Sequence, residues 1–171
     1  MEIVDLYDKF RNKTNKTQPR KQPLEDQTFR SVLHVCIFDS KGRMLLQQRS
    51  AKKDTFAHMW DISLGGGVQA GENVCQAAER ELGEELGIDA DFSTLRPAFT
   101  INFDGGFDDF FILQKDVKLE DLKFRDHEVT NAQYATKKQV LQLLKSGNFV
   151  PYKESIIKLI YEMRKSTGSF V

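Results

Sequence analysis

The sequence has little of what stabilises or anchors the more specialised protein classes. It holds 2 cysteines in 171 residues, which excludes a disulfide scaffold or a cysteine-rich zinc site. With 4 prolines, 11 glycines and 40% hydrophobic residues, it is neither collagen-like nor disordered. No apolar run reaches the ~18 residues of a membrane span. The first ten residues contain three acids and no apolar core, so we expect no signal peptide, no membrane partner and a cytoplasmic location.

The sequence also lacks an excess of charge. Its 25 basic and 25 acidic residues cancel, which disfavours a broadly basic nucleic-acid-binding protein. The cancellation hides two local imbalances. Residues 9–24 carry six cations and no acid, whereas residues 72–91 carry seven acids and one base. The basic segment is either a solvated arm or an arm that faces phosphate or a partner, such as an RNA cap.

The length fits one domain with a short extension. We assign residues 1–28 to an N-terminal extension, a basic arm with a possible edge strand, and residues 29–171 to the domain. The apolar residues near the N-terminus could add that strand or pair across a homodimer interface.

From residue 30 onward, the hydrophobic pattern predicts strands alternating with helices. Residues 32–38 are an apolar run typical of a strand buried on both faces, and a turn followed by residues 44–49 predicts a hairpin. Further strands are expected at 60–64, in two segments of 98–113 and at 131–135. Helices are expected from Asn73 to Gly87, from Thr136 to Leu144 and over 153–165. This order predicts a single α/β domain with a mixed sheet covered by helices.

The best-defined helix carries an unusual set of carboxylates. At ~100° per residue, Glu81, Glu84 and Glu85 share an arc of about 100° with Val74 and Ala78, on the packed side of the helix. Carboxylates placed there repel each other and lose solvation unless a cation joins them. Magnesium, which prefers oxygen ligands, fits this need, although an acid-rich helix can also be simply solvated and salt-bridged.

The residues around this helix form a longer pattern. Gly66, five residues, Glu72, seven residues and then the segment 80–88 (Arg-Glu-Leu-Gly-Glu-Glu-Leu-Gly-Ile) resemble the signature of the Nudix hydrolases at all nine fixed positions. The resemblance implies a Nudix-type α/β/α sandwich over residues 29–171. It also implies attack of water on a diphosphate linkage, in a nucleoside diphosphate derivative or related small diphosphate, with Mg²⁺ or Mn²⁺ bound.

The resemblance implies roles for individual residues. Arg80 would orient the carboxylates of the helix. The metal ligands would come from the helix, the glycine run and the acid before the helix, namely Glu81, Glu84, Glu85, Gly65, Gly66 and Glu72. In the family the general base is either a glutamate of the signature or an acid on a later loop; Glu128 is a candidate of the second kind, with Asp108 and Asp109 as weaker ones.

Residues 45–50, with Lys53 and Trp60, resemble the branch that contains the isopentenyl diphosphate isomerases. There, the arginine and lysine at these places hold the substrate diphosphate, which implies Arg49 and Lys53 as substrate contacts. The isomerase cysteine and histidine are replaced by Gly65 and Gly67, and a further histidine by Arg30. Hydrolysis is therefore predicted, with a non-catalytic nucleotide sensor or an isomerase as alternatives.

The sequence does not select a substrate. Its 13 phenylalanines offer surfaces on which a base could stack, and Phe103 is the candidate we single out.

Overall fold

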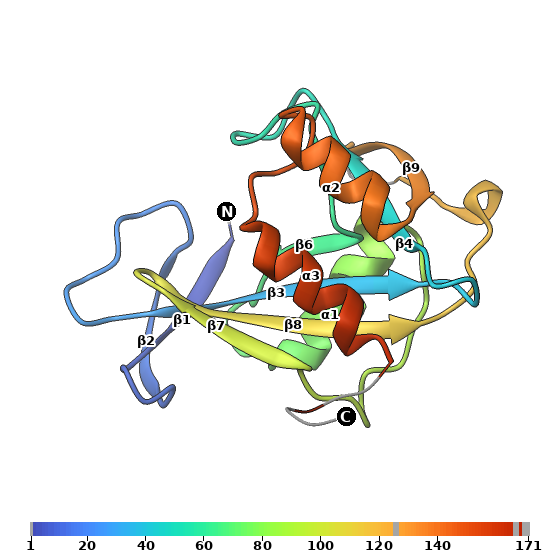
Figure 1. Cartoon of the computed structure of the whole chain (residues 1–171). Helices are drawn as coiled ribbons and strands as arrows, with labels where there is room; N and C mark the ends of the chain where they lie inside the picture. The colour runs from blue at the N-terminus through green and yellow to red at the C-terminus, as the bar shows by residue number, and fades with distance from the viewer. Residues whose placement is uncertain (1, 125–126, 166–167, 169–171) are drawn as a thin grey trace.

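The structure is a computed structural model that describes residues 2–124, 127–165 and 168 (Figure 1). These residues form strands, three α-helices and one short 3-10 helix. In chain order the elements are β1 (Ile3–Tyr7), β2 (Lys13–Pro19), β3 (Arg30–Phe38), β4 (Met44–Arg49), β5 (Trp60–Asp61), β6 (Leu64–Gly67), α1 (Val74–Glu85), β7 (Phe99–Phe103), β8 (Gly106–Gln114), η1 (Leu119–Asp121), β9 (Val129–Ala135), α2 (Lys137–Lys145) and α3 (Glu154–Met163).

The main sheet is mixed and centres on β3. Strand β3 pairs in parallel with β8 and antiparallel with β6, and β7 extends the sheet beyond β8. Strand β4 pairs instead with β5 and β9. The predicted hairpin of β3 and β4 is correct only at its turn, because the two strands share one residue pair, Phe38 and Met44, before they diverge. This divergence opens the sheet between β3 and β4.

Alternation along the strands produces two cores. In β3, the side chains of Leu33, Val35 and Ile37 pack towards α1, whereas Cys36 and Phe38 pack towards α2 and α3. Figure 1 shows α1 behind the sheet and α3 in front of it. A continuous apolar strand is therefore buried on both faces, and the predicted α/β/α sandwich with a mixed sheet is confirmed.

The helix boundaries follow local signals in the sequence. Asn73 accepts hydrogen bonds from the backbone N–H groups of Cys75 and Gln76, and Thr136 caps α2 in the same way through Gln139. After α1, Gly87 adopts a φ of +68°, which turns the chain away from the helix. No helix in the described residues is long and apolar enough to cross a membrane.

The N-terminal residues fold as a separate two-stranded sheet, β1–β2, rather than a solvated arm or an edge strand of the main sheet. Within β1, the side chains of Val4 and Leu6 are buried. The backbones of Tyr7 and Phe29 exchange two hydrogen bonds, of 2.7 and 2.9 Å. Figure 1 places this hairpin beside the N-terminal end of β3. It therefore stands next to the start of β3 and the C-terminal end of β6, where the backbone N–H of Ala70 donates to the carbonyl oxygen of Ile3.

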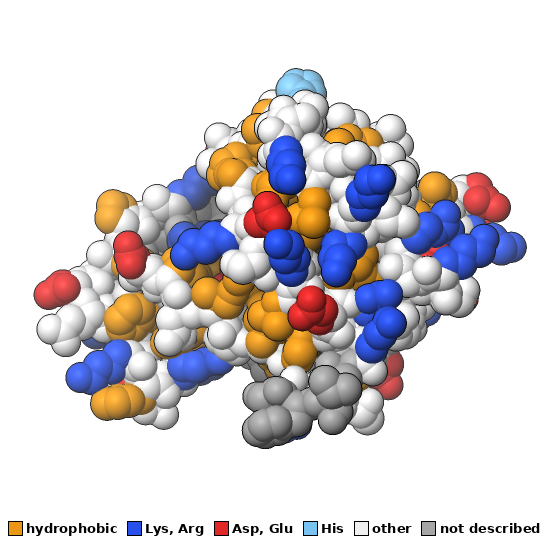
Figure 2. Space-filling view, in the orientation of Figure 1, with side chains coloured by type: hydrophobic (Ala, Val, Ile, Leu, Met, Phe, Trp, Pro, Cys, Tyr) orange, Lys and Arg blue, Asp and Glu red, His pale blue; other side chains and the backbone are white. Residues whose placement is uncertain are grey.

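The face of the sandwich that α2 and α3 cover carries charges of both signs. Figure 2 shows Lys and Arg side chains over the face covered by α2 and α3, interspersed with acidic ones.

Candidate active site

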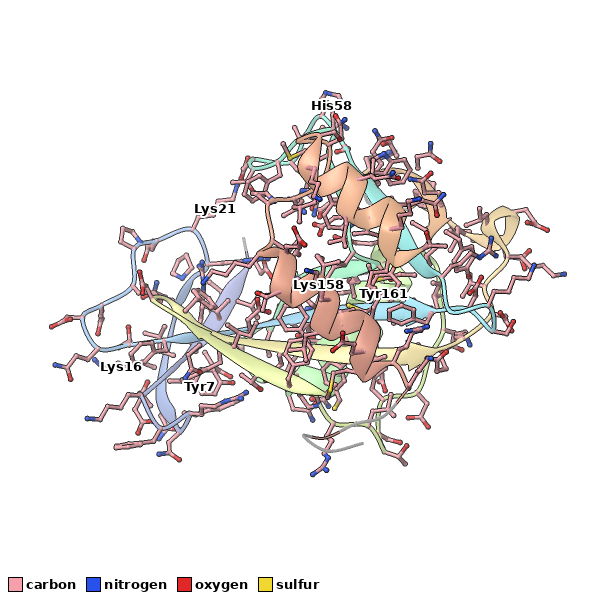
Figure 3. All side chains as sticks on the ribbon, viewed as in Figure 1. Tyr7, Lys16, Lys21, His58, Lys158 and Tyr161 are labelled. Atoms are coloured by element: carbon pink, nitrogen blue, oxygen red, sulfur yellow. The ribbon has the colours of Figure 1, made fainter. Side chains whose placement is uncertain are left out.

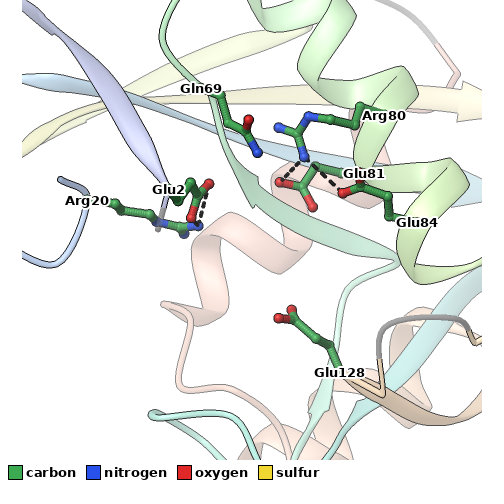
Figure 4. Close-up of a pocket in the computed structure, with 7 residues that line it drawn as sticks. All are labelled: Glu2, Arg20, Gln69, Arg80, Glu81, Glu84 and Glu128. Carbon is green, nitrogen blue, oxygen red and sulfur yellow. Dashed lines mark hydrogen bonds and ion pairs between the residues drawn. The ribbon is translucent and has the colours of Figure 1, made fainter. Parts of the chain in front are cut away.

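A cavity of about 330 Å³ lies where α1, the glycine strand and the N-terminal hairpin meet. Figure 4 shows its walls, to which three distant parts of the chain contribute. They are Glu2 and Arg20 of the hairpin region, Gln69, Arg80, Glu81 and Glu84 on and before α1, and Glu128 beside β9. The fold thus brings the predicted Glu128 to the same cavity as the helix carboxylates.

Arg80 is the centre of the carboxylate group. Its guanidinium binds both oxygens of Glu72, at 2.7 and 3.0 Å. It also contacts Glu81 at 3.0 Å and Glu84 at 3.1 Å. The hydrogen bond with Glu72 raises the pKa of Arg80 and holds the pKa of Glu72 below its ordinary value. One fixed cation therefore arranges three of the predicted acids.

The glycine run lets the backbone approach α1. Arg80 also donates a hydrogen bond of 3.1 Å to the carbonyl oxygen of Gly67. The sequence analysis named the backbone carbonyls of Gly65 and Gly66 as candidate metal ligands. It did not single out the carbonyl of Gly67, which binds Arg80. The α-carbon of Gly66 faces Glu81, whereas that of Gly65 faces His34, on the other side of β6. Burial raises the pKa of Glu81, against the opposing effect of Arg80.

A second cation holds the C-terminal end of α1. The side chain of Glu85 is 3% exposed, and its carboxylate contacts the Lys53 ammonium at 3.1 Å. Lys53 also binds Glu128. Burial raises the pKa of Glu85, and the nearby charge of Lys53 opposes this effect. Burial alone would lower the pKa of Lys53, but the carboxylates of Glu85 and Glu128 outweigh it, so the pKa of Lys53 is raised. Burial alone would raise the pKa of Glu128, but Lys53 outweighs it, so Glu128 has a lowered pKa and is ionised near neutral pH.

A network of hydrogen bonds that extends into the protein interior holds Arg49 in place. It donates to Asp61 at 3.1 Å and to the carbonyl oxygen of Thr55. Tyr152 donates to Asp61 at 3.0 Å and also contacts His34 at 3.0 Å. Arg49 and Lys53 both line a second cavity, of about 880 Å³, which shares Glu2, Arg20 and Glu128 with the first. The two predicted phosphate contacts thus lie next to the carboxylates.

Other sequence candidates lie elsewhere. Asp109 is fully buried against Arg11 and Thr100, and Asp108 contacts His34 at 2.5 Å; neither lines the two cavities, so they do not reach the cleft. Phe103 is 39% exposed at the end of β7 and is also absent from both linings.

Sequence reasoning missed Glu2, Arg20 and Gln69 as cavity residues. For Arg20, the acid-free run of cations was the available signal. For Glu2 and Gln69 no local pattern exists.

The oxygen donors fit a hard divalent ion. Glu85 is a buried carboxylate, and the side-chain oxygen of the neighbouring Gln47 is buried without a hydrogen-bond partner among the described residues. Within residues 2–124, 127–165 and 168, no three acidic, His or Cys side chains are arranged to hold one ion; Arg80 and Lys53 pair with these carboxylates instead. The oxygen donors fit such an ion, and in this structure Arg80 and Lys53 are paired with them.

A mixed sheet between helices, with an acid-bearing helix beside a glycine strand, defines a Nudix-type sandwich. Residues 27–158 match the NUDIX domain family. The uncharacterised Nudix hydrolase lin0387 of Listeria innocua is 39% identical over 167 residues, which are 98% of each chain. The crystal structure of DR0079 from Deinococcus radiodurans superposes with a TM-score of 0.74 at 22% identity, over 94% of this chain and 98% of that one.

An isopentenyl-diphosphate Δ-isomerase of Serratia proteamaculans is 38% identical over a shorter stretch of 89 residues, 52% of this chain and 48% of that protein. The chain belongs to the Nudix hydrolase family, whose enzymatic class is that of pyrophosphohydrolases.

Proposed function

We propose that this chain is a divalent-metal-dependent hydrolase that cleaves a diphosphate linkage, in a nucleoside diphosphate derivative or related small diphosphate, by attack of water. The observation that carries the proposal is the polarity of the cleft. Glu72, Glu81 and Glu84 gather around Arg80 on one side, and Arg49 and Lys53 stand on the other.

Glu81, Glu84 and Glu85 would hold Mg²⁺ or Mn²⁺, with Glu72 or the carbonyls of Gly65 or Gly66 as further ligands. When bound, such an ion offsets the charge of the diphosphate and lowers the pKa of the attacking water. Arg80 keeps the carboxylates oriented. Arg49 and Lys53 bind the phosphate oxygens and place the linkage beside α1. Phe103 stays a weaker candidate for contact with the rest of the substrate.

Glu128 is the proposed general base. Its side chain is 47% exposed, lines both cavities and is kept ionised by Lys53, so it can accept a proton from water. Glu85 is the other candidate, but its 3% exposure and its contact with Lys53 favour ligation over proton transfer.

The test is product release from a panel with either metal. Suitable compounds are ADP-ribose, nucleotide sugars, nucleoside triphosphates, dinucleoside polyphosphates and isoprenoid diphosphates. We expect metal-dependent hydrolysis of at least one nucleoside diphosphate derivative. Tight nucleotide binding without product would instead indicate a nucleotide sensor, and interconversion of isopentenyl diphosphate isomers would indicate an isomerase.

Single substitutions test whether the proposed metal ligands matter more for turnover than an acidic residue elsewhere on the surface. Glu84→Gln and Glu85→Gln should each reduce turnover by about 10²-fold or more at unchanged fold. The matched control is Glu154→Gln, since Glu154 lies on α3 and pairs with Lys158 there. Wild-type turnover in both site variants would refute the ligand assignment.

The remaining parts of the proposal concern partners. We propose a small-molecule substrate rather than nucleic acid, a cytoplasmic location and a homodimer. Sedimentation of the purified chain tests the last of these.

A further inference from the structure

We propose that Arg20, Arg30 and Lys52 form a second anion subsite, which binds a phosphate group of the substrate that is not part of the cleaved linkage. This inference rests on the proposed hydrolase function and names the class of substrate that the enzyme prefers.

The subsite lies in the larger cavity, which is joined to the carboxylate cavity through Glu2, Arg20 and Glu128. Six cationic side chains and three acidic ones line it. The cations are Arg20, Lys21, Arg30, Arg49, Lys52 and Lys53, and the acids are Glu2, Asp54 and Glu128. The smaller cavity has the opposite balance, with four acids and two cations. Charge is thus divided along one continuous cleft.

Four of the six cations are already engaged. Arg49 binds Asp61, Lys53 binds Glu85 and Glu128, Lys21 contacts Asp54 at 2.5 Å, and Arg20 binds Glu2. Figure 3 shows Lys21 on the segment after β2, on the side of the loop that follows β4. These pairs shape the walls of the cavity. Arg30 and Lys52 make no ion pair within the described residues, so the excess positive charge comes from these two cations.

Arg20 and Arg30 are neighbours, and the carboxylate of Glu2 is bound by Arg20. Arg20 binds both oxygens of Glu2, at 3.1 and 2.8 Å, and its own carbonyl oxygen accepts a hydrogen bond of 3.0 Å from Arg30. The Nε of Arg30 is buried without a hydrogen-bond partner in the described part of the chain. Burial, followed by the like charge of Arg20, lowers the pKa of Arg30, and Glu2 opposes this. Arg30 therefore lies beside a second guanidinium and has no carboxylate of its own among the described residues, an arrangement that favours a bound anion.

Lys52 adds a cation on the other wall. It is exposed, and its ammonium makes no ion pair within the described ranges. An anion that enters the cavity between the hairpin and this loop meets Arg30 and Lys52 without displacing an existing partner of either side chain. Arg20 can join them by exchanging Glu2 for the anion. The same site would give no advantage to an uncharged sugar.

The preferred substrate therefore carries an additional phosphate. Two sources share this chemistry: a longer polyphosphate chain and a phosphomonoester on the ribose. The first arm of the test compares ATP with ADP, and the second compares ADP-ribose 2′-phosphate with ADP-ribose. In at least one arm, we expect kcat/KM of wild-type enzyme to favour the more phosphorylated compound by about tenfold or more. A ratio near one in both arms overturns the proposal.

Variants assign the preference to these side chains. Arg30→Gln and Lys52→Gln should each move the ratio towards one, and Arg30→Lys should retain part of it. The matched control is Lys16→Gln, since Lys16 is a hairpin lysine paired with Glu25 and lies away from Lys21 in Figure 3. If Arg30→Gln fails to fold, the exposed Lys52→Gln decides. A ratio unchanged in Lys52→Gln and in folded Arg30→Gln refutes the subsite.

Binding without metal separates this proposal from the hydrolase assignment. In EDTA, calorimetry should show adenosine 2′,5′-bisphosphate binding more tightly than AMP, or tripolyphosphate more tightly than pyrophosphate, and Lys52→Gln should reduce the difference. If this preference occurs and no compound is hydrolysed, the subsite stands and the hydrolase function fails. If hydrolysis occurs without any binding preference, the hydrolase function stands and the subsite fails.

Discussion

Gly66 lies directly against the side chain of Glu81. A β-carbon at Gly66 would stand 2.7 Å from Cγ and 2.9 Å from Oε1 of Glu81, closer than real β-carbons approach other atoms. The glycine therefore determines where this carboxylate can point. Gly83, on the same helix, has open space around its α-carbon, and a β-carbon added there would meet no atom within 4 Å.

Replacing Gly66 by alanine should reduce kcat/KM by at least about tenfold, because Glu81 must leave its place between β6 and Arg80. The measurement is steady-state kinetics on the best substrate of the panel. In the control, Gly83→Ala should retain activity and stabilise the helix by about 0.5–1 kcal/mol. Comparable activity losses in both variants would show that the contact with Glu81 is not the cause.

Replacing Arg80 by lysine should weaken the site although the charge is kept. A single ammonium cannot span Glu72, Glu81 and Glu84 as the planar guanidinium does. We expect a loss of about 10–100-fold in activity and a higher Mg²⁺ concentration for half-activation. Arg43→Lys is the control, because Arg43 pairs with Asp39 in a distant turn. An unaltered Mg²⁺ curve would contradict the orienting role.

Metal binding should stabilise the protein more as the pH rises. In the metal-free protein, burial raises the pKa of Glu81 and Glu85 above the ordinary 4.5, so the folded state binds these protons more tightly than the unfolded chain. That stabilisation is complete below pH 4.5 and is lost as the pH rises through the folded pKa values. A divalent ion needs ionised carboxylates and so replaces the protons at high pH.

Thermal unfolding in EDTA and in Mg²⁺ checks this behaviour. At a Mg²⁺ concentration of 100 times Kd, the gain is about 2.7 kcal/mol, or roughly 5–10 °C for a chain of this length. The shift should be larger at pH 8 than at pH 5 and should decrease in Glu84→Gln. A shift independent of pH would be inconsistent with these carboxylates as ligands.

Arg11 should prove necessary for the stability of the N-terminal hairpin. It makes two hydrogen bonds, of 3.1 and 2.6 Å, to the fully buried carboxylate of Asp109. Among the described residues, Arg11→Ala leaves that carboxylate with Thr100 as its side-chain partner. The substitution should cost about 2–3 kcal/mol in urea unfolding, less than for a fully buried pair because Arg11 is half-exposed. The exposed pair of Lys16 and Glu25 supplies the control: Lys16→Ala should cost less than about 0.5 kcal/mol. Equal effects would mean that the hairpin is not anchored through Asp109.

The sequence predicted the parts of this protein that depend on local periodicity and fixed spacing. The apolar run of β3 predicted a strand buried on both faces, and Asn73 and Gly87 predicted the ends of the segment that contains α1. The nine signature positions from Gly66 to Ile88 predicted the family. Each of these signals lies within about 25 residues, where the backbone alone relates one side chain to the next.

Only the tertiary structure decided what surrounds that helix. Strand β2 has no apolar alternation, so nothing in residues 13–19 predicts a hairpin that brings Arg20 and Glu2 to the cleft. The meeting of Lys53, Glu85 and Glu128 joins segments more than 30 residues apart. Asp109 shows the same limit, because its partner is Arg11 rather than the cleft. A buried charge without an oppositely charged partner is costly, and the tertiary fold rather than the distance along the sequence determines which partner lies close enough.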